Sequence, residues 1–67
     1  MRVTEETRER TRRRILRTAA RLFRRRGFEG ATTREVARAA GVGSGTLFNY
    51  YPSKEALALA LVARGLE

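Results

Sequence analysis

The sequence predicts an all-α fold, in which a three-helix helix-turn-helix domain is followed by the start of a fourth helix. Apolar residues recur at helical spacing in several segments, glycine-hydrophobic pairs end two of them, and no run alternates with the period of a strand. With 67 residues, the chain has room for one small domain. It contains no Cys and no His, so neither a disulfide nor a thiolate or imidazole metal site stabilises it. We therefore expect the domain to depend on a partner or on a further part of the protein.

The first helix is expected over residues 11–26, where apolar side chains form one face and arginines fill the others. Gly27 stands where a left-handed C-terminal cap is needed, and Phe28 is the hydrophobic residue that folds back on the last turn. The apolar face consists of Ile15, Leu16, Ala19, Ala20, Leu22 and Phe23.

The segment TTRE, residues 32–35, predicts the start of a second, short helix. The Thr32 hydroxyl can accept a hydrogen bond from the Glu35 backbone, while the Glu35 carboxylate accepts one from the Thr32 backbone, as in a capping box. Gly41 and Val42 then repeat the glycine-hydrophobic ending of the first helix. The inner face is expected to hold Val36, Ala37 and Ala40.

A turn of only two residues, Val42 and Gly43, separates the second helix from a third that begins near Ser44. So short a turn forces a sharp crossing angle, which is the geometry of a helix-turn-helix. The third helix must end by Tyr51, because Pro52 restricts the residue before it and has no N–H to donate.

A fourth helix is expected from Lys54 onward, with Ser53 as its cap. It is apolar on more sides than a small terminal helix needs, with one charged residue in the range 56–65. We expect another part of the protein to cover it, and we interpret the chain as the leading part of a longer protein. The inner residues of this helix are expected to be Leu57, Leu61 and Leu66.

The formal net charge of +8 is concentrated at the start of the chain. Residues 1–26 hold eleven Arg and three Glu, a net charge of +8, whereas residues 27–67 hold three Arg, one Lys and four Glu, a net charge of 0. This asymmetry predicts contact with a polyanion, and nucleic acid ranks ahead of an anionic membrane surface. Genome composition or growth at high temperature explains Arg in place of Lys, but it does not explain why the charge collects in one segment.

The same inventory argues against catalysis and against a cofactor. No His or Cys is present as a base or nucleophile, and the glycines of GVGSG follow no strand and precede no Lys-Ser/Thr pair, so a nucleotide site is not expected. No run approaches the ~20 apolar residues that span a bilayer, and the first residues lack the apolar segment of a signal peptide. We expect a cytoplasmic protein that is not an enzyme and does not bind a membrane.

The third helix has the division of a recognition helix. Gly45, Thr46, Asn49 and Tyr50 are expected on one side, with small residues at the start and groups that reach bases or phosphates beyond them. For any one of these residues, the alternative is a solvated helix whose aromatic edge packs on its neighbours. The residues expected to pack rather than bind are Leu47 and Tyr51, which face inward, and Phe48 at the boundary.

The span AGVGSGTLFNYYPSKEAL, residues 40–57, resembles the signature of the tetracycline-repressor (TetR) family of bacterial transcription regulators. The similarity extends upstream through AARLFRRRGFEGATTREVARAAGV and covers nearly everything from Ile15 onward. It implies sequence-specific binding of double-stranded operator DNA, as a homodimer on a palindrome. It also implies a C-terminal domain outside this chain that dimerises and binds a small-molecule inducer.

The resemblance also implies roles for individual residues. Base-facing positions correspond to Arg34, Ser44, Gly45, Thr46 and Asn49, and phosphate-binding positions correspond to Thr33, Tyr50 and Lys54. Two positions depart from the family pattern. Gly43 replaces a Ser that commonly caps the recognition helix, so capping is expected to pass to Ser44. Phe48 replaces a Tyr, so the hydroxyl that could bind a phosphate is missing and only packing is expected of this side chain.

These considerations divide the chain into a basic N-terminal arm at residues 1–10, a helix-turn-helix domain at 11–53 and a fourth helix at 54–67. The arm, with Arg2, Arg8 and Arg10, either enters an A·T-rich minor groove or is a solvated tail. The alternative to a DNA-binding domain is a cationic peptide, centred on the first helix, that binds a membrane surface or RNA.

Overall fold

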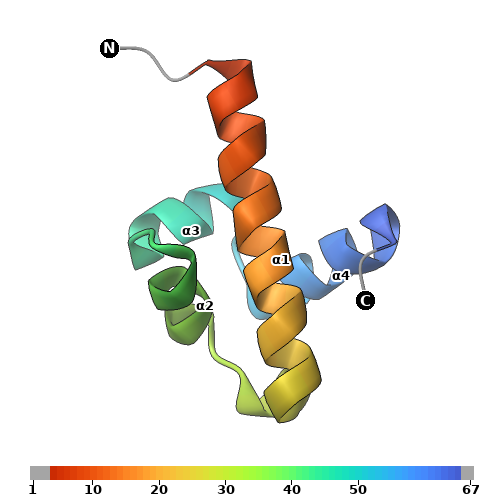
Figure 1. Cartoon of the computed structure of the whole chain (residues 1–67). Helices are drawn as coiled ribbons and strands as arrows, with labels where there is room; N and C mark the ends of the chain where they lie inside the picture. Colours follow the sequence, from red (N-terminus) through yellow and green to blue (C-terminus); the bar gives the residue numbers. More distant parts are fainter. Residues whose placement is uncertain (1–3, 66–67) are drawn as a thin grey trace.

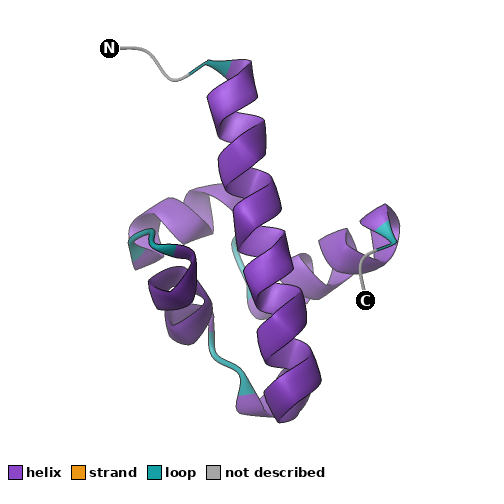
Figure 2. Ribbon diagram, in the orientation of Figure 1, coloured by secondary structure: helices purple, strands orange, loops and turns teal. Residues whose placement is uncertain are grey.

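The computed structural model describes residues 4–65, and four helices account for nearly all of them. They are α1 (Glu5–Gly30), α2 (Thr33–Ala40), α3 (Ser44–Tyr50) and α4 (Lys54–Arg64), and no strand occurs in the described range. In Figure 1, α2 and α3 lie on one side of the long α1 and α4 lies on the other, and Figure 2 shows the short loops that join them. The predicted all-α fold is confirmed. The predictions for Arg2 and Leu66 fall outside the described residues.

Helix α1 begins at Glu5, six residues before the predicted start. The Thr4 hydroxyl caps it by accepting a 3.0 Å hydrogen bond from the backbone N–H of Thr7. Glu5 and Glu6 in the first turn complement the positive end of the helix dipole. Residues 5–10, including Arg8 and Arg10, are therefore helical. The expected boundary at residues 10 and 11 lies inside α1, so this part of the predicted arm is not an extended segment.

The regular helix breaks at Gly27, the residue where its end was predicted, but with a different backbone conformation. Gly27 has φ 78° and ψ 161°, so its φ is positive while its ψ lies far from the left-handed helical value. One further turn continues to Gly30, and the N–H of Ala31 donates to the carbonyl of Gly27 at 3.2 Å. The Phe28 ring folds back on Phe23 with a centroid distance of 5.4 Å. The hydrophobic contact was predicted correctly and the cap geometry was not.

Helix α2 has both of its predicted ends. The Thr32 hydroxyl accepts from the N–H of Glu35, and the Glu35 carboxylate accepts from the N–H of Thr32, each at 3.1 Å, which completes the capping box. At the other end Gly41 is left-handed, with φ 77° and ψ 27°. The N–H of Val42 donates to the Ala37 carbonyl at 2.9 Å, which is the long bond of a Schellman motif.

Helices α3 and α4 follow with different N-terminal caps. Gly43 is the N-cap of α3 and offers no side-chain hydrogen bond, while Ser44 is the first residue inside the helix. The expectation that Ser44 takes over capping is therefore wrong, because the backbone of Gly43 already occupies that position. Helix α3 ends at Tyr50, as the proline requires. In α4, the Ser53 hydroxyl accepts from the N–H of Ala56 at 3.0 Å, as predicted.

One apolar core joins all four helices. The buried face of α1 packs on α2 and α4, and α2 packs on α3. The apolar side of α1 is thus enclosed by the rest of the domain instead of being free for a lipid surface. On α4, Leu59 and Val62 remain 71% and 78% exposed. Within residues 4–65, no helix combines the length and the hydropathy needed to cross a membrane. The core residues are Ile15, Leu16, Ala19, Ala20, Val36, Ala37, Ala40, Leu47, Leu57 and Leu61.

Candidate nucleic-acid interface

Helix α3 presents a polar face to solvent and an apolar face to the core. The side chain of Leu47 is 1% exposed, and Tyr50 and Tyr51 are partly buried against the core. Phe48, which we expected to pack, is instead 47% exposed and does not belong to the core. A residue directly after the buried Leu47 turns about 100° away from it on a helix, which carries its side chain off the inner face. The predicted base-facing residues of α3 are all exposed: Ser44, Gly45, Thr46 and Asn49.

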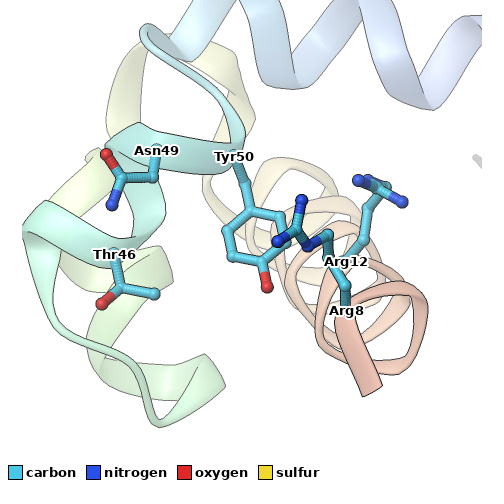
Figure 3. Close-up of a pocket in the computed structure, with 5 residues that line it drawn as sticks. All are labelled: Arg8, Arg12, Thr46, Asn49 and Tyr50. Carbon is cyan, nitrogen blue, oxygen red and sulfur yellow. The ribbon is translucent and has the colours of Figure 1, made fainter. Parts of the chain in front are cut away.

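An open depression of about 380 Å³ lies between α3 and the first turns of α1. Thr46, Asn49 and Tyr50 line it from α3, and Arg8 and Arg12 line it from α1. In Figure 3, the ring of Tyr50 reaches from α3 toward the two arginines. The structure therefore brings three predicted site residues together with two cations, and the depression offers hydroxyl, amide and guanidinium groups side by side. We call it the α1/α3 pocket.

The two arginines were missed as part of this site. Arg8 was assigned to an arm, and Arg12 was not singled out. The helical spacing of the sequence contained this information. With α1 beginning at Glu5, Arg8 and Arg12 lie one turn apart, on the same side of the helix as the buried Ile15, Leu16 and Ala19. Recognising the Thr4 cap would have placed both arginines on the inner side of the helix.

Arg12 is held in place from two directions. Its guanidinium lies 5.7 Å from the centroid of the Tyr50 ring and donates to the Glu9 carboxylate at 2.6 Å. Glu9 also accepts from Arg64 of α4 at 3.0 Å. The hydrogen bonds from Arg64 and then Arg12 lower the pKa of Glu9 below its ordinary value. Arg8 has no ion pair among residues 4–65, so its charge remains available at the rim of the pocket.

At the start of α2, Thr33 is partly buried and Arg34 is exposed. The neighbouring Glu35 accepts from Thr32 and from the guanidinium of Arg26, and the Thr32 backbone contributes most to the lowered pKa of Glu35. None of the ion pairs within residues 4–65 involves Arg34. Arg34 is thus a solvated arginine on the surface of α2 in this structure, and its contact with a base stays a prediction.

Lys54 makes contacts that the sequence did not predict. Its ammonium donates to the carbonyls of Phe28 at 2.7 Å and Ala31 at 3.0 Å, and it lies 4.5 Å from the centroid of the Phe28 ring. These contacts join the start of α4 to the last turn of α1 and to its C-cap residue, Ala31. Since an ammonium has three N–H donors, two are already used within the domain. Lys54 thus connects α4 to the end of α1, and its contact with a phosphate stays a prediction.

Comparison with known proteins gives matches among bacterial transcription regulators. The family described as bacterial regulatory proteins, tetR family, matches residues 15–61. The chain is 43% identical over 51 residues to the HTH-type transcriptional repressor AcnR of Corynebacterium efficiens, which covers 76% of this chain and 27% of AcnR. It is 35% identical over 57 residues to the HTH-type transcriptional regulator UidR of Escherichia coli, covering 85% of this chain and 29% of UidR.

A third relative is the HTH-type transcriptional repressor KstR2 of Rhodococcus jostii, 44% identical over 43 residues, or 64% of this chain and 21% of KstR2. The chain thus spans less than a third of the length of each of these relatives. No solved structure matches the chain significantly.

Proposed function

This chain belongs to the tetR family of bacterial regulatory proteins, and from that premise we propose that it binds an operator in double-stranded DNA with α3 in the major groove. One observation carries the proposal: the exposed polar face of α3 is continuous with a pocket whose other wall carries two arginines. A recognition helix needs both base-reading groups and nearby cations that hold the phosphates. Here α3 carries the groups for reading bases and the neighbouring α1 carries the cations for holding phosphates, which supports both roles.

The bases are read by the first turns of α3. Asn49 can pair with the two adenine edge groups, and the Thr46 hydroxyl can donate or accept while its methyl touches thymine. Ser44, freed from capping by Gly43, contributes a second hydroxyl at the helix start. At Gly45 a Cβ would point into open space and contact nothing in the domain. Because glycine has no Cβ, the backbone of α3 can come closer to the base edges at this position.

Arg34 at the start of α2 is the best candidate for a guanine contact. Its guanidinium can donate to both major-groove acceptors of one guanine, and each such bidentate pair contributes about 1–3 kcal/mol of discrimination. Its exposure and its lack of an ion pair within residues 4–65 support this role.

Phosphates are held on both flanks of the base-reading face. Arg8 supplies a free charge from α1, and the Tyr50 hydroxyl supplies a donor from α3. Thr33 at the start of α2 and Lys54 at the start of α4 contact phosphates of the DNA backbone. For Lys54, this contact uses the N–H that Phe28 and Ala31 leave over.

The finer parts of the proposal concern the whole protein. We propose that it acts in the cytoplasm as a homodimer on a palindromic operator, through a C-terminal domain outside this chain that also binds an inducer. The names of AcnR and KstR2, both repressors, support repression. One domain supplies few base contacts, so a second copy held nearby makes the second contact effectively intramolecular.

Selection of bound DNA from a random pool tests the proposed function. The chain is captured with bound duplex over several rounds, alongside a Thr46→Ala/Asn49→Ala variant and an Arg38→Ala control whose change lies on the exposed side of α2. We expect the wild type and the control to enrich one motif, and the double variant to lose the preference at the base pairs that Thr46 and Asn49 read. Enrichment of the same motif by all three proteins, or of no motif by the wild type, would contradict the proposal.

A further inference from the structure

A row of arginines on α1 lies outside the α1/α3 pocket. Four of them line a second open depression of about 260 Å³, with no other residue contributing to its lining. The row continues for two more turns with the same spacing. We call these residues the outer arginine strip, and all of them are exposed: Arg10, Arg13, Arg14, Arg17, Arg21 and Arg24.

The strip faces away from the core. At about 100° per residue, its members fall on the side of α1 opposite the buried Ile15, Leu16 and Ala19. Arg8 and Arg12, which line the α1/α3 pocket, share the inner side with those core residues. The thickness of α1, about 10–12 Å with side chains, therefore separates the strip from the pocket. We therefore expect a straight duplex bound by α3 to leave the strip unoccupied.

Almost nothing within the domain neutralises this charge. Glu9 approaches Arg13 at 3.7 Å, and no other ion pair among residues 4–65 involves a member of the strip. Within the strip, Arg10 and Arg14, Arg13 and Arg17, and Arg17 and Arg21 are like charges four residues apart, which destabilise a helix. The domain thus carries an unfavourable charge arrangement that an external polyanion would relieve.

We propose that the outer arginine strip binds the phosphate backbone of a second segment of duplex DNA while α3 holds the first. This inference rests on the proposed function, because the first segment is the one that α3 binds. From Arg10 to Arg24 the strip extends for about 21 Å at 1.5 Å per residue, along which a duplex offers many phosphates. Guanidinium groups suit phosphates because their N–H donors match two phosphate oxygens at once.

Two observations favour DNA over a lipid surface. The apolar side of α1 is buried in the core, and the strip itself contains only arginines, so no apolar group is available to enter a bilayer. A domain bound to its operator is also surrounded by the flanking DNA at high effective concentration. The second segment is either a flank of the same molecule or a different molecule, and both present the same phosphate backbone.

A two-duplex capture experiment tests the proposal. A biotinylated duplex of about 30 base pairs, three helical turns, carries the motif enriched from the random pool and is saturated with the 67-residue chain. A fluorescent duplex of scrambled sequence is then added, and its retention is measured over a salt series. The strip variant is Arg14→Gln/Arg17→Gln. The matched control is Arg26→Gln/Arg38→Gln, which removes the same charge from exposed positions outside the strip.

We expect the wild type and the control to retain the scrambled duplex. The strip variant should lose most of this retention, and its slope against the logarithm of salt should be lower by about two units, one for each lost phosphate contact. A parallel arm extends the captured duplex with flanking DNA and measures affinity. If the flanks raise the affinity of the wild type but not that of the strip variant, the second segment is a flank of the same DNA molecule. If the wild type retains the separate duplex but gains no affinity from the flanks, the second segment belongs to a different molecule.

Retention by the strip variant equal to that of the control, with no difference on flanked DNA, would overturn the inference. So would a strip variant that loses only its binding to phosphatidylserine vesicles. The proposed function fails separately, when the wild type shows no preference for the enriched duplex over the scrambled one.

Discussion

Glu9 and Arg64 form an ion pair at 3.0 Å that joins the second turn of α1 to the last turn of α4. The same carboxylate accepts from Arg12, whose guanidinium lies over the ring of Tyr50. One acidic side chain thereby connects α4, α1 and the α1/α3 pocket. The position of α4 and the position of Arg12 are linked through it.

We expect this connection to stabilise the domain at neutral pH and to be lost in acid. The pKa of Glu9 is lowered by Arg64 and then by Arg12, so the ion pair's contribution is present above the ordinary glutamate pKa of about 4.3 and disappears as the pH falls through the lowered value. Glu9→Gln should lower the melting temperature at pH 7 and converge with the wild type in acid. Thermal melts of both proteins from pH 2 to pH 8 measure this. Glu29→Gln serves as the control, because Glu29 is an exposed carboxylate of the same helix that makes no ion pair among residues 4–65. A constant gap between Glu9→Gln and the wild type at every pH would contradict the account.

Lys54 is expected to matter for folding before it matters for DNA. Lys54→Met keeps the aliphatic stem but leaves the carbonyls of Phe28 and Ala31 without their donor. Hydrogen bonds to a charged group contribute about 1.5–3 kcal/mol, and the partial exposure of Lys54 places the expected loss of unfolding free energy at about 1–3 kcal/mol. Urea denaturation measures it, with Glu55→Gln as the control on the next residue. Unchanged stability together with a salt slope lowered by about one unit would show that Lys54 serves phosphate binding alone.

Arg8 is expected to contact phosphate without contributing to the fold. Arg8→Gln should weaken binding to enriched and scrambled duplexes alike and lower the salt slope by about one unit. The melting temperature should stay close to that of the wild type, since Arg8 has no ion pair among residues 4–65. Arg38→Gln removes the same charge away from the pocket and should leave the slope unchanged. A changed base preference in Arg8→Gln would assign this residue to the bases instead.

Arg34 is expected to read a single base pair. Arg34→Ala should relax the preference at one position of the half-site by about 1–3 kcal/mol and leave the other positions intact. Binding to a set of duplexes, each with one base pair changed, measures this. Arg38→Ala, one turn further along α2, is the control. If every preference survives in Arg34→Ala, this residue has no part in recognition.

The ends of the helices were largely predictable from the sequence because they depend on local chemistry. The capping box of Thr32 and Glu35, the left-handed Gly41 and the cap at Ser53 each involve residues within a turn of one another. The start of α1 was missed because apolar spacing was used there, whereas Thr4 marks the start by its hydroxyl. At Gly27, a positive φ was foreseen but the following turn was not.

Contacts between distant segments could not be predicted in this way. Lys54 bonds to Ala31, which lies 23 positions before it in the sequence, and to Phe28, which lies 26 positions before it. Glu9 and Arg64 are 55 positions apart. The α1/α3 pocket exists only after α3 has packed near the first turns of α1. The sequence indicated which residues of α3 are exposed, but the partners that surround them depend on the packing of the four helices.

The central claim is that Thr46 and Asn49 distinguish base sequences while the cations around them supply most of the affinity. The affinities of the wild type and of Thr46→Ala/Asn49→Ala for the enriched and the scrambled duplex, each over a salt series, test it most directly. The account predicts that the ratio between the two duplexes falls strongly in the double variant, because two base contacts are gone and only those of Arg34 and Ser44 remain. Its salt slope should stay at the wild-type value, because the phosphate contacts remain. A double variant that keeps the wild-type ratio would contradict the account and show that Thr46 and Asn49 take no part in recognition.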